Sequence, residues 1–189
     1  MSIIIRRMRE EDIPQAVEIE KSAFTRPWSK SIFKATLLLP YAAYYVAAEQ
    51  PENPEQTADQ ADQADQPDHE QYKGRENKAE GAPKEDPEQT EDREKIVGIC
   101  GVKKIFEEGD ISNVAVHPDY RRKGICRRML ETLLSEARND GVTDFTLEVR
   151  AGNTPAVRLY ESLGFRTEGI RPGFYDHPVE DGLIMWLRK

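Results

Sequence analysis

A run of basic residues around one glycine is the first feature of this chain that could do chemistry. Five cations and this glycine occupy eight positions: Arg121, Arg122, Lys123, Gly124, Arg127 and Arg128. They coincide with the predicted start of a helix, where free N–H groups attract anions and cations oppose the helix dipole. The arrangement favours a bound phosphate group, which the backbone can approach closely at Gly124. The alternative is a basic helix start that is simply well solvated.

Glu148 and Tyr160 are candidates for proton transfer. Glu148 lies on the polar side of an alternating stretch, where a carboxylate can accept a proton or merely face water. Tyr160 lies on the apolar side of a predicted helix and is a possible donor, because a phenol has a pKa of about 10. It is also a common type of core residue. The residues alone favour the structural interpretation at both positions.

The elements that must position these residues are a strand, a helix and a second strand. Strand-forming residues precede the basic run and stop at Pro118, which has no N–H to donate. One apolar helical face follows: Ile125, Met129, Leu133, Leu134 and Ala137. Another strand is predicted at 145–149. This strand–helix–strand unit, 113–149, is expected to be parallel and right-handed.

The remaining elements predict an α/β fold, a mixed sheet with helices on both faces. Further strands are predicted at 3–8, 44–48, 96–106, 166–170 and 183–187, and further helices at 12–24, 30–39 and from 154 to Leu163. Glu20 repeats at helical spacing with the apolar residues of the first helix. Ser29 is expected to cap the second helix, and Asn153 or Thr154 the last. Trp28 is expected in the core rather than in a groove, and 171–182 is expected to be a loop.

An acidic segment separates two of the predicted strands. From Gln50 to Lys95 there are 15 Asp and Glu residues against 6 Lys and Arg residues, so the rest of the chain carries a net charge of +1. Residues 50–94 contain five prolines and no Val, Ile, Leu, Met, Phe or Trp. We therefore expect one domain over 1–189, interrupted at 50–94 by a disordered, low-complexity insert. The insert is either inert or a tether that binds a partner.

Two cysteines and three histidines make no disulfide framework and no metal pattern. No long apolar run or signal-peptide core is present in the sequence. We expect a cytoplasmic protein without a metal, a membrane or a nucleic acid among its partners.

Several phrases of the sequence resemble the GNAT acetyltransferases. They are Val114-Ala-Val-His-Pro-Asp-Tyr-Arg-Arg-Lys-Gly-Ile-Cys-Arg127, Leu147-Glu-Val-Arg-Ala-Gly-Asn-Thr-Pro-Ala156 and Leu159-Tyr-Glu-Ser-Leu-Gly-Phe165. With Arg26-Pro-Trp-Ser29 and Glu180-Asp-Gly-Leu-Ile-Met185, they resemble the ribosomal-protein-alanine N-acetyltransferase group of that family. The resemblance implies a seven-stranded, mostly antiparallel GNAT sheet whose central parallel β-α-β unit binds acetyl-CoA.

The resemblance also implies roles for individual residues. The backbone of Val114, Ala115 and Val116 would pair with the pantetheine arm of acetyl-CoA. Asn153 would also contact the coenzyme, Glu148 would be the general base, and Tyr160 would protonate the departing thiolate. Backbone amides would hold the pyrophosphate along the whole turn: Arg121, Arg122, Lys123, Gly124, Ile125, Cys126 and Arg127.

Cys126 departs from the family motif, which has Gly or Ala at this position. We expect its sulfur to point into the core and do nothing. The alternative is an oxidisable switch, because a helix N-terminus among cations favours a thiolate.

The resemblance favours transfer of acetyl to a protein N-terminus, that of alanine in a small-subunit ribosomal protein. An α-amine has a pKa of about 7.8 and lysine about 10.4, so neutralising lysine costs roughly 3.5 kcal/mol more. A modest base such as Glu148, acting through a water, suits the α-amine. No Cys or Ser is placed as a nucleophile, which favours direct transfer in a ternary complex. The alternatives are a GNAT enzyme for small amines or lysine, and an idle acyl-CoA-binding module.

Overall fold

The computed structural model describes residues 2–50 and 94–189, so the predicted insert lies outside the described residues except at its two ends. The helices are α1 (Ile13–Ala23), α2 (Lys30–Leu37), α3 (Ile125–Asn139) and α4 (Thr154–Ser162). The strands are β1 (Ser2–Arg7), β2 (Ala42–Gln50), β3 (Lys95–Ile105), β4 (Glu108–Val116), β5 (Asp144–Arg150), β6 (Arg166–Asp176) and β7 (Val179–Leu187). Short 3-10 turns lie at Glu10–Asp12 and Pro118–Tyr120.

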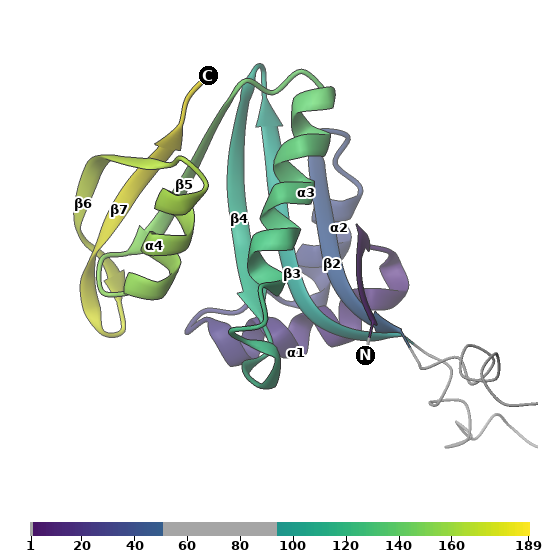
Figure 1. Ribbon diagram of the computed structural model, residues 1–189. Coiled ribbons are helices and arrows are strands. Elements are labelled where there is room, and N and C mark those ends of the chain that lie inside the picture. Colours follow the sequence, from purple (N-terminus) through teal and green to yellow (C-terminus); the bar gives the residue numbers. More distant parts are fainter. Residues whose placement is uncertain (1, 51–93) are drawn as a thin grey trace, which may run out of the picture.

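The described strands form one seven-stranded sheet in the order β1-β2-β3-β4-β5-β7-β6. The β4–β5 pair is parallel and every other neighbouring pair is antiparallel. The parallel pair is joined through α3, as the sequence predicted for 113–149 (Figure 1). The mixed, mostly antiparallel sheet is therefore confirmed.

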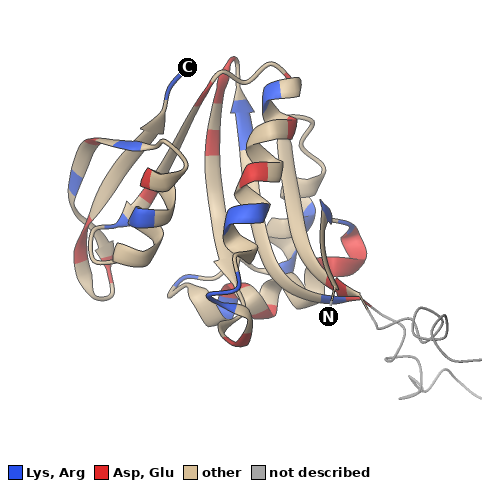
Figure 2. Ribbon diagram, in the orientation of Figure 1, with Lys and Arg blue, Asp and Glu red and all other residues tan. Residues whose placement is uncertain are grey.

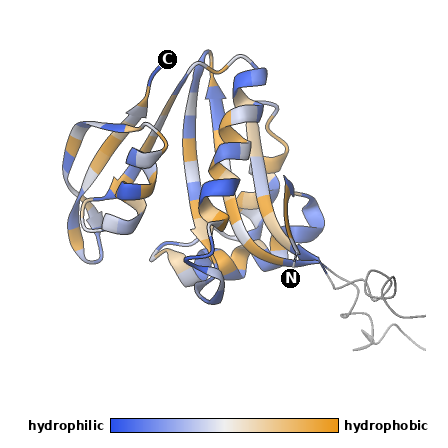
Figure 3. Cartoon of the chain, in the orientation of Figure 1, coloured by the Kyte–Doolittle hydropathy of each residue, from blue (hydrophilic) through white to orange (hydrophobic). Residues whose placement is uncertain are grey.

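Helices cover both faces of this sheet and enclose two separate cores. On one face α1 and α2 pack through residues such as Ile13, Ile19 and Phe33. On the other face α3 supplies Met129 and Leu133, and hydrophobic segments run along the strands beneath it (Figures 1 and 3). Because the strands are buried from both sides, burial rather than helix or strand propensity holds the layers together.

The sheet opens between β4 and β5, which lie together at one end and diverge toward the other (Figure 1). They pair only from Glu108 opposite Asp144 to Ile111 opposite Leu147, although β4 continues to Val116 and β5 to Arg150. The open ends of both strands therefore border a gap in the ladder, and unpaired backbone groups on β4 face it.

A bulge in β4 lies where this opening begins. On β3, Ile99 pairs with Ala115 and Gly101 pairs with Ser112, so the single intervening residue of β3 faces two residues of β4. Asn113, one of these two, has φ of +52°, a backbone conformation that few residues other than glycine adopt. The bulge bends the strand and re-aims its last residues.

The predicted loop at 171–182 is wrong, because most of it belongs to a hairpin. β6 continues to Asp176 and β7 begins at Val179, with Tyr175 opposite Glu180. Pro172 and Gly173 are typical strand breakers. Here the structure places them inside a register shift of β6, where the ladder is interrupted and then resumes.

Candidate functional site

The loop between β4 and α3 has the backbone shape of an anion site. Arg122 has φ of +64° and Gly124 has φ of +75°, directly before the first turn of α3. A Cβ built on Gly124 would meet nothing within 4 Å. The N–H groups of that first turn therefore face open space, and a side chain on Gly124 would intrude into it. Figure 2 shows Lys and Arg gathered at this loop.

The basic side chains of the loop do not all point toward this space. Arg121 donates from Nε to the carbonyl of Val116 at 3.1 Å and braces the end of β4. Arg127 donates to Ser162 Oγ at 2.6 Å, and Arg128 reaches the carbonyl of Ile3 at 2.7 Å. These three guanidinium groups already have protein partners.

Other members of the predicted set contribute in different ways. Lys123 Nζ lies 4.9 Å from the centre of the Tyr120 ring. Within the described chain, Arg122 forms no hydrogen bond or ion pair through its side chain, so its guanidinium is available to an anion. Ile125 is 3% exposed, which leaves its backbone N–H as the group it can offer.

Val114, Ala115 and Val116 form the open end of β4. Ala115 and Val116 pair with β3 on one side, but beyond Ile111 the strand has no partner on the β5 side. Their side chains are buried or half-buried, so the backbone is what they present to the opening. An extended ligand can pair with such an edge as an added strand does.

Glu148 lies on the other side of the opening, one residue beyond the last β4–β5 pair. Its side chain is 31% exposed and accepts a hydrogen bond from Arg171 Nη1 at 2.7 Å. The carboxylate is thus accessible and paired with a cation. Sequence reasoning missed Arg171 as a site residue because it assigned that segment to a loop.

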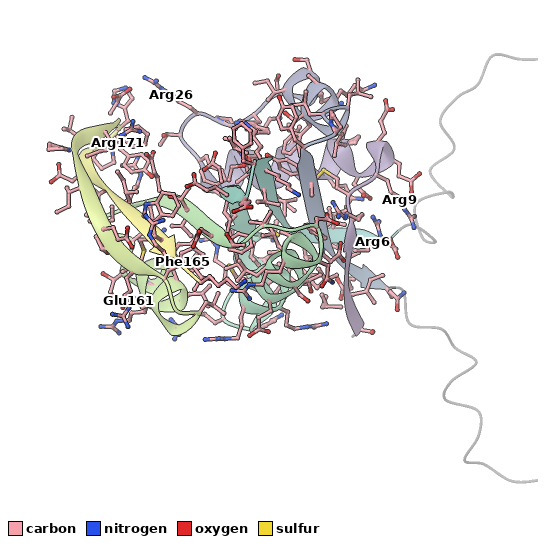
Figure 4. The ribbon with its side chains drawn as sticks, turned by 90° about the horizontal axis from the view of Figure 1, so that it is seen from above. Arg6, Arg9, Arg26, Glu161, Phe165 and Arg171 are labelled. Carbon is pink, nitrogen blue, oxygen red and sulfur yellow. The ribbon has the colours of Figure 1, made fainter. Side chains whose placement is uncertain are left out.

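Tyr160 has the surroundings of a core residue. Its ring is buried, 7% exposed, and packs edge-on against Phe165 with centroids 5.9 Å apart (Figure 4 marks Phe165). No hydrogen bond within residues 2–50 and 94–189 involves its hydroxyl, and no buried side-chain oxygen of these residues lacks a partner, so the hydroxyl is not fully enclosed. Burial raises the pKa of Tyr160 above its usual range, with smaller effects from Cys126 and other neighbours. The phenol therefore stays protonated at neutral pH and remains free to donate its proton.

Asn153 and Cys126 both have structural roles, one in capping a helix and the other in packing against the core. Asn153 caps α4, since its Oδ1 accepts from the N–H of Ala156 at 3.4 Å. Burial raises the pKa of the Cys126 thiol to about 11. The side chain packs against the core, as expected, and desolvation outweighs the helix dipole and the neighbouring cations, which argues against the alternative of an easily ionised thiol.

The β6–β7 hairpin brings further residues to the edge of the opening. The Arg150 guanidinium lies 4.2 Å from the centre of the Tyr175 ring and 3.3 Å from Glu180 Oε2. Arg26 of the α1–α2 loop pairs with Asp176 of this hairpin, and Figure 4 shows Arg26 and Arg171 on the same side of the molecule. Two segments far apart in the sequence thus meet beside Glu148.

A model of the acetyltransferase (GNAT) family matches residues 41–165, the stretch that carries the basic loop, the opened strands and Glu148. The chain belongs to the GNAT family. As a GNAT acetyltransferase it uses acetyl-CoA to acetylate an amine, and the predicted fold and family are confirmed.

The GNAT chain is similar to several proteins, over nearly its whole length or over about half of it. A putative ribosomal protein bS18-alanine N-acetyltransferase of Bacillus subtilis (strain 168) is 29% identical over 184 residues, which are 97% of this chain and 93% of that protein. The bS18-alanine N-acetyltransferase of Escherichia coli (strain K12) is 42% identical over 88 residues, 47% of this chain and 58% of that enzyme.

Solved structures give the same relationship. The crystal structure of the ribosomal-protein-S18-alanine N-acetyltransferase from Escherichia coli has a TM-score of 0.68 and 26% identity, covering 98% of this chain and 93% of that one. The NatC complex bound to Gag peptide and CoA has a TM-score of 0.69 and 16% identity, covering 100% of this chain and 99% of that one, and shares the fold.

None of the described helices is both long and apolar enough to cross a membrane. Over 2–50 and 94–189, no group of three or more His, Cys, Asp and Glu side chains is placed to hold a metal ion.

Proposed function

We propose that this GNAT enzyme transfers the acetyl group of acetyl-CoA to a protein N-terminal amine, that of alanine in a small-subunit ribosomal protein. The observation that carries the proposal is the opening between β4 and β5, which is bordered by an accessible carboxylate, Glu148. The proposed proton donor is Tyr160 of α4, a buried phenol that stays protonated. The similarity to bS18-alanine N-acetyltransferases along almost the whole chain supports the choice of acceptor.

Acetyl-CoA fits the groups that surround the opening. The pyrophosphate would lie against the N–H groups of the turn from Arg121 to Arg127, in the open space beside Gly124. The pantetheine arm would pair with Val114, Ala115 and Val116, whose backbone has no β5 partner. Asn153 remains a proposed contact in addition to its cap. The bound thioester supplies an activated acetyl group and a thiolate leaving group.

The chain's own residues would manage the protons of the reaction. An α-ammonium has no lone pair, so Glu148 would take one proton from it, directly or through a water. The neutral amine would then attack the thioester carbonyl in a ternary complex, so that the C–N bond forms, the C–S bond breaks and the nitrogen loses its extra proton to water. Tyr160 would give its proton to the departing sulfur, and burial keeps the phenol protonated until that step.

An acceptor panel tests the proposal. The wild-type enzyme is incubated with acetyl-CoA and, separately, an Ala-initiated peptide, the same peptide with a blocked N-terminus and one internal lysine, and free polyamines. We expect acetylation of the free α-amine alone. Reaction with polyamines only would assign the chain to small amines, and CoA binding without any transfer would make it an idle binding module.

A further inference from the structure

A buried polar cluster lies on the α1 face of the sheet, apart from Glu148 and Tyr160. Glu20 of α1 is 1% exposed and Tyr44 of β2 is 2% exposed. Asn113 joins them: its Nδ2 donates to Glu20 Oε1 at 2.5 Å, and its Oδ1 accepts from the Tyr44 hydroxyl at 3.1 Å. Tyr44 also bonds with Ser112 Oγ at 3.1 Å, so the cluster holds two successive residues of β4.

This cluster holds the β4 bulge in its unusual shape. Asn113 has φ of +52°, which costs an ordinary residue about 1 kcal/mol or more and persists only where surrounding contacts enforce it. Both ends of its carboxamide are hydrogen-bonded, and the Tyr44 ring lies so close to Gly101 that a Cβ there would clash with it. The bulge is therefore fixed from the α1 side.

The same carboxylate connects the bulge to the other side of the opening. The second oxygen of Glu20 accepts from the backbone N–H of Trp28 at 3.4 Å, in the α1–α2 loop. That loop carries Arg26, which pairs with Asp176 of the β6–β7 hairpin. One buried group thus contacts both the strand that would hold the acetyl group and the loop at the acceptor side.

Burying this polar cluster costs stability, which a purely structural role does not explain. In the described chain Glu20 forms no ion pair, and burial raises its pKa. A carboxyl group buried without a cation lowers the stability of a fold relative to a well-packed apolar side chain. Such groups are more often retained where their geometry serves a site.

We propose that Glu20 and Asn113 are positioning residues for acetyl transfer, which fix the β4 bulge so that the backbone N–H groups of Val114 to Val116 meet the thioester carbonyl. The inference rests on the proposed placement of the acetyl group against β4. It does not depend on which amine is the acceptor.

A reciprocal exchange tests the pair. Asn113→Asp sets a second carboxylate against Glu20, whereas Asn113→Asp with Glu20→Gln restores one carboxylate and one amide in reversed order. Asp tolerates positive φ as Asn does. In the double variant the amide introduced on α1 can donate to the carboxylate introduced on β4 and still accept from the Trp28 N–H, while that carboxylate accepts from Tyr44. Asn139→Asp, at the exposed end of α3, adds the same charge far from the bulge.

We expect Asn113→Asp to lower kcat by about 10²-fold, because misplacement by about 1 Å has that effect on a reacting geometry. The double variant should recover to within about tenfold of wild type, and Asn139→Asp should be unaffected. In Asn113→Asp the KM for acetyl-CoA should change much less than kcat does, since the pyrophosphate turn is untouched and only the pantetheine contacts lie on the bulged strand. Rates are measured per folded enzyme with the acceptor that wild type uses best.

A wild-type kcat for Asn113→Asp, or a loss that the double variant does not repair, would overturn the inference. If Asn113→Asp does not fold, Tyr44→Phe replaces it, since it removes the hydroxyl that donates to Asn113 Oδ1 and adds no charge. Full kcat in a folded Tyr44→Phe enzyme would equally overturn it. Because any amine acceptor can be used, failure of the alanine proposal leaves this test intact.

Discussion

Tyr160→Phe removes one oxygen atom and keeps the ring, so it separates a catalytic role of the hydroxyl from a packing role of the ring. The ring that packs on Phe165 is kept, and no hydrogen bond between described residues involves the hydroxyl that is lost. The free energy of unfolding should therefore change by no more than about 0.5 kcal/mol. If the phenol protonates the departing thiolate, kcat should fall by about 10²–10⁴-fold, which corresponds to roughly 3–5 kcal/mol of barrier.

Tyr45→Phe is the matched control. Tyr45 is also buried on the sheet, but its hydroxyl donates to Glu136 Oε2 at 2.8 Å, away from the opening. Losing a hydrogen bond to a charged group should cost about 1.5–3 kcal/mol of stability and leave kcat unchanged. Thiol release measures kcat, and urea unfolding measures stability. A Tyr160→Phe enzyme with wild-type kcat would refute the acid role. If activity falls only in proportion to a loss of stability, Tyr160 acts as a core residue and not as an acid.

Three further predictions address the loop, the alkaline stability and the insert. Gly124→Ala should weaken CoA binding about tenfold, as measured by calorimetry. Gly173→Ala is the control, because Gly173 also has a positive φ and open space around it. Both variants should lose about 1–2 kcal/mol of stability from the strained backbone, but only Gly124→Ala should lose CoA affinity. The raised pKa of Tyr160 contributes stability that is present below about pH 10 and lost above it, so Tyr160→Phe should unfold less readily at high pH. Joining Gln50 to Glu94 by a short turn should keep the activity and raise stability by about 2 kcal/mol, because β2 and β3 are already paired at Glu49 and Lys95. Loss of activity on a protein acceptor alone would make the insert a partner-binding tether.

The basic loop and the elements around it could be predicted because their signals are local. A strand that stops at Pro118, a glycine and an apolar helical face are all visible within a single short stretch of sequence. Glu148 and Tyr160 could be placed on their elements, but their functional importance came from the family resemblance. No local sequence signal predicts that β5 separates from β4 after Leu147, because that opening depends on pairing between distant strands.

The errors and omissions share one cause, which is tertiary contact. Pro172 and Gly173 predicted a loop, yet pairing with β7 carries the strand past them. Glu20 gave a usable signal, a carboxylate at helical spacing with apolar residues, but its partner Asn113 is 93 residues away in sequence.

The central claim is tested most directly by the intact acceptor. The wild-type enzyme and the Glu148→Gln, Tyr160→Phe double variant are each incubated with acetyl-CoA and a small-subunit ribosomal protein whose N-terminal alanine is free. Mass spectrometry with peptide mapping then locates any acetyl group. We predict one acetyl group on the alanine α-amine with wild type and none with the variant. Acetylation confined to lysine side chains, or equal acetylation by both enzymes, would contradict the account.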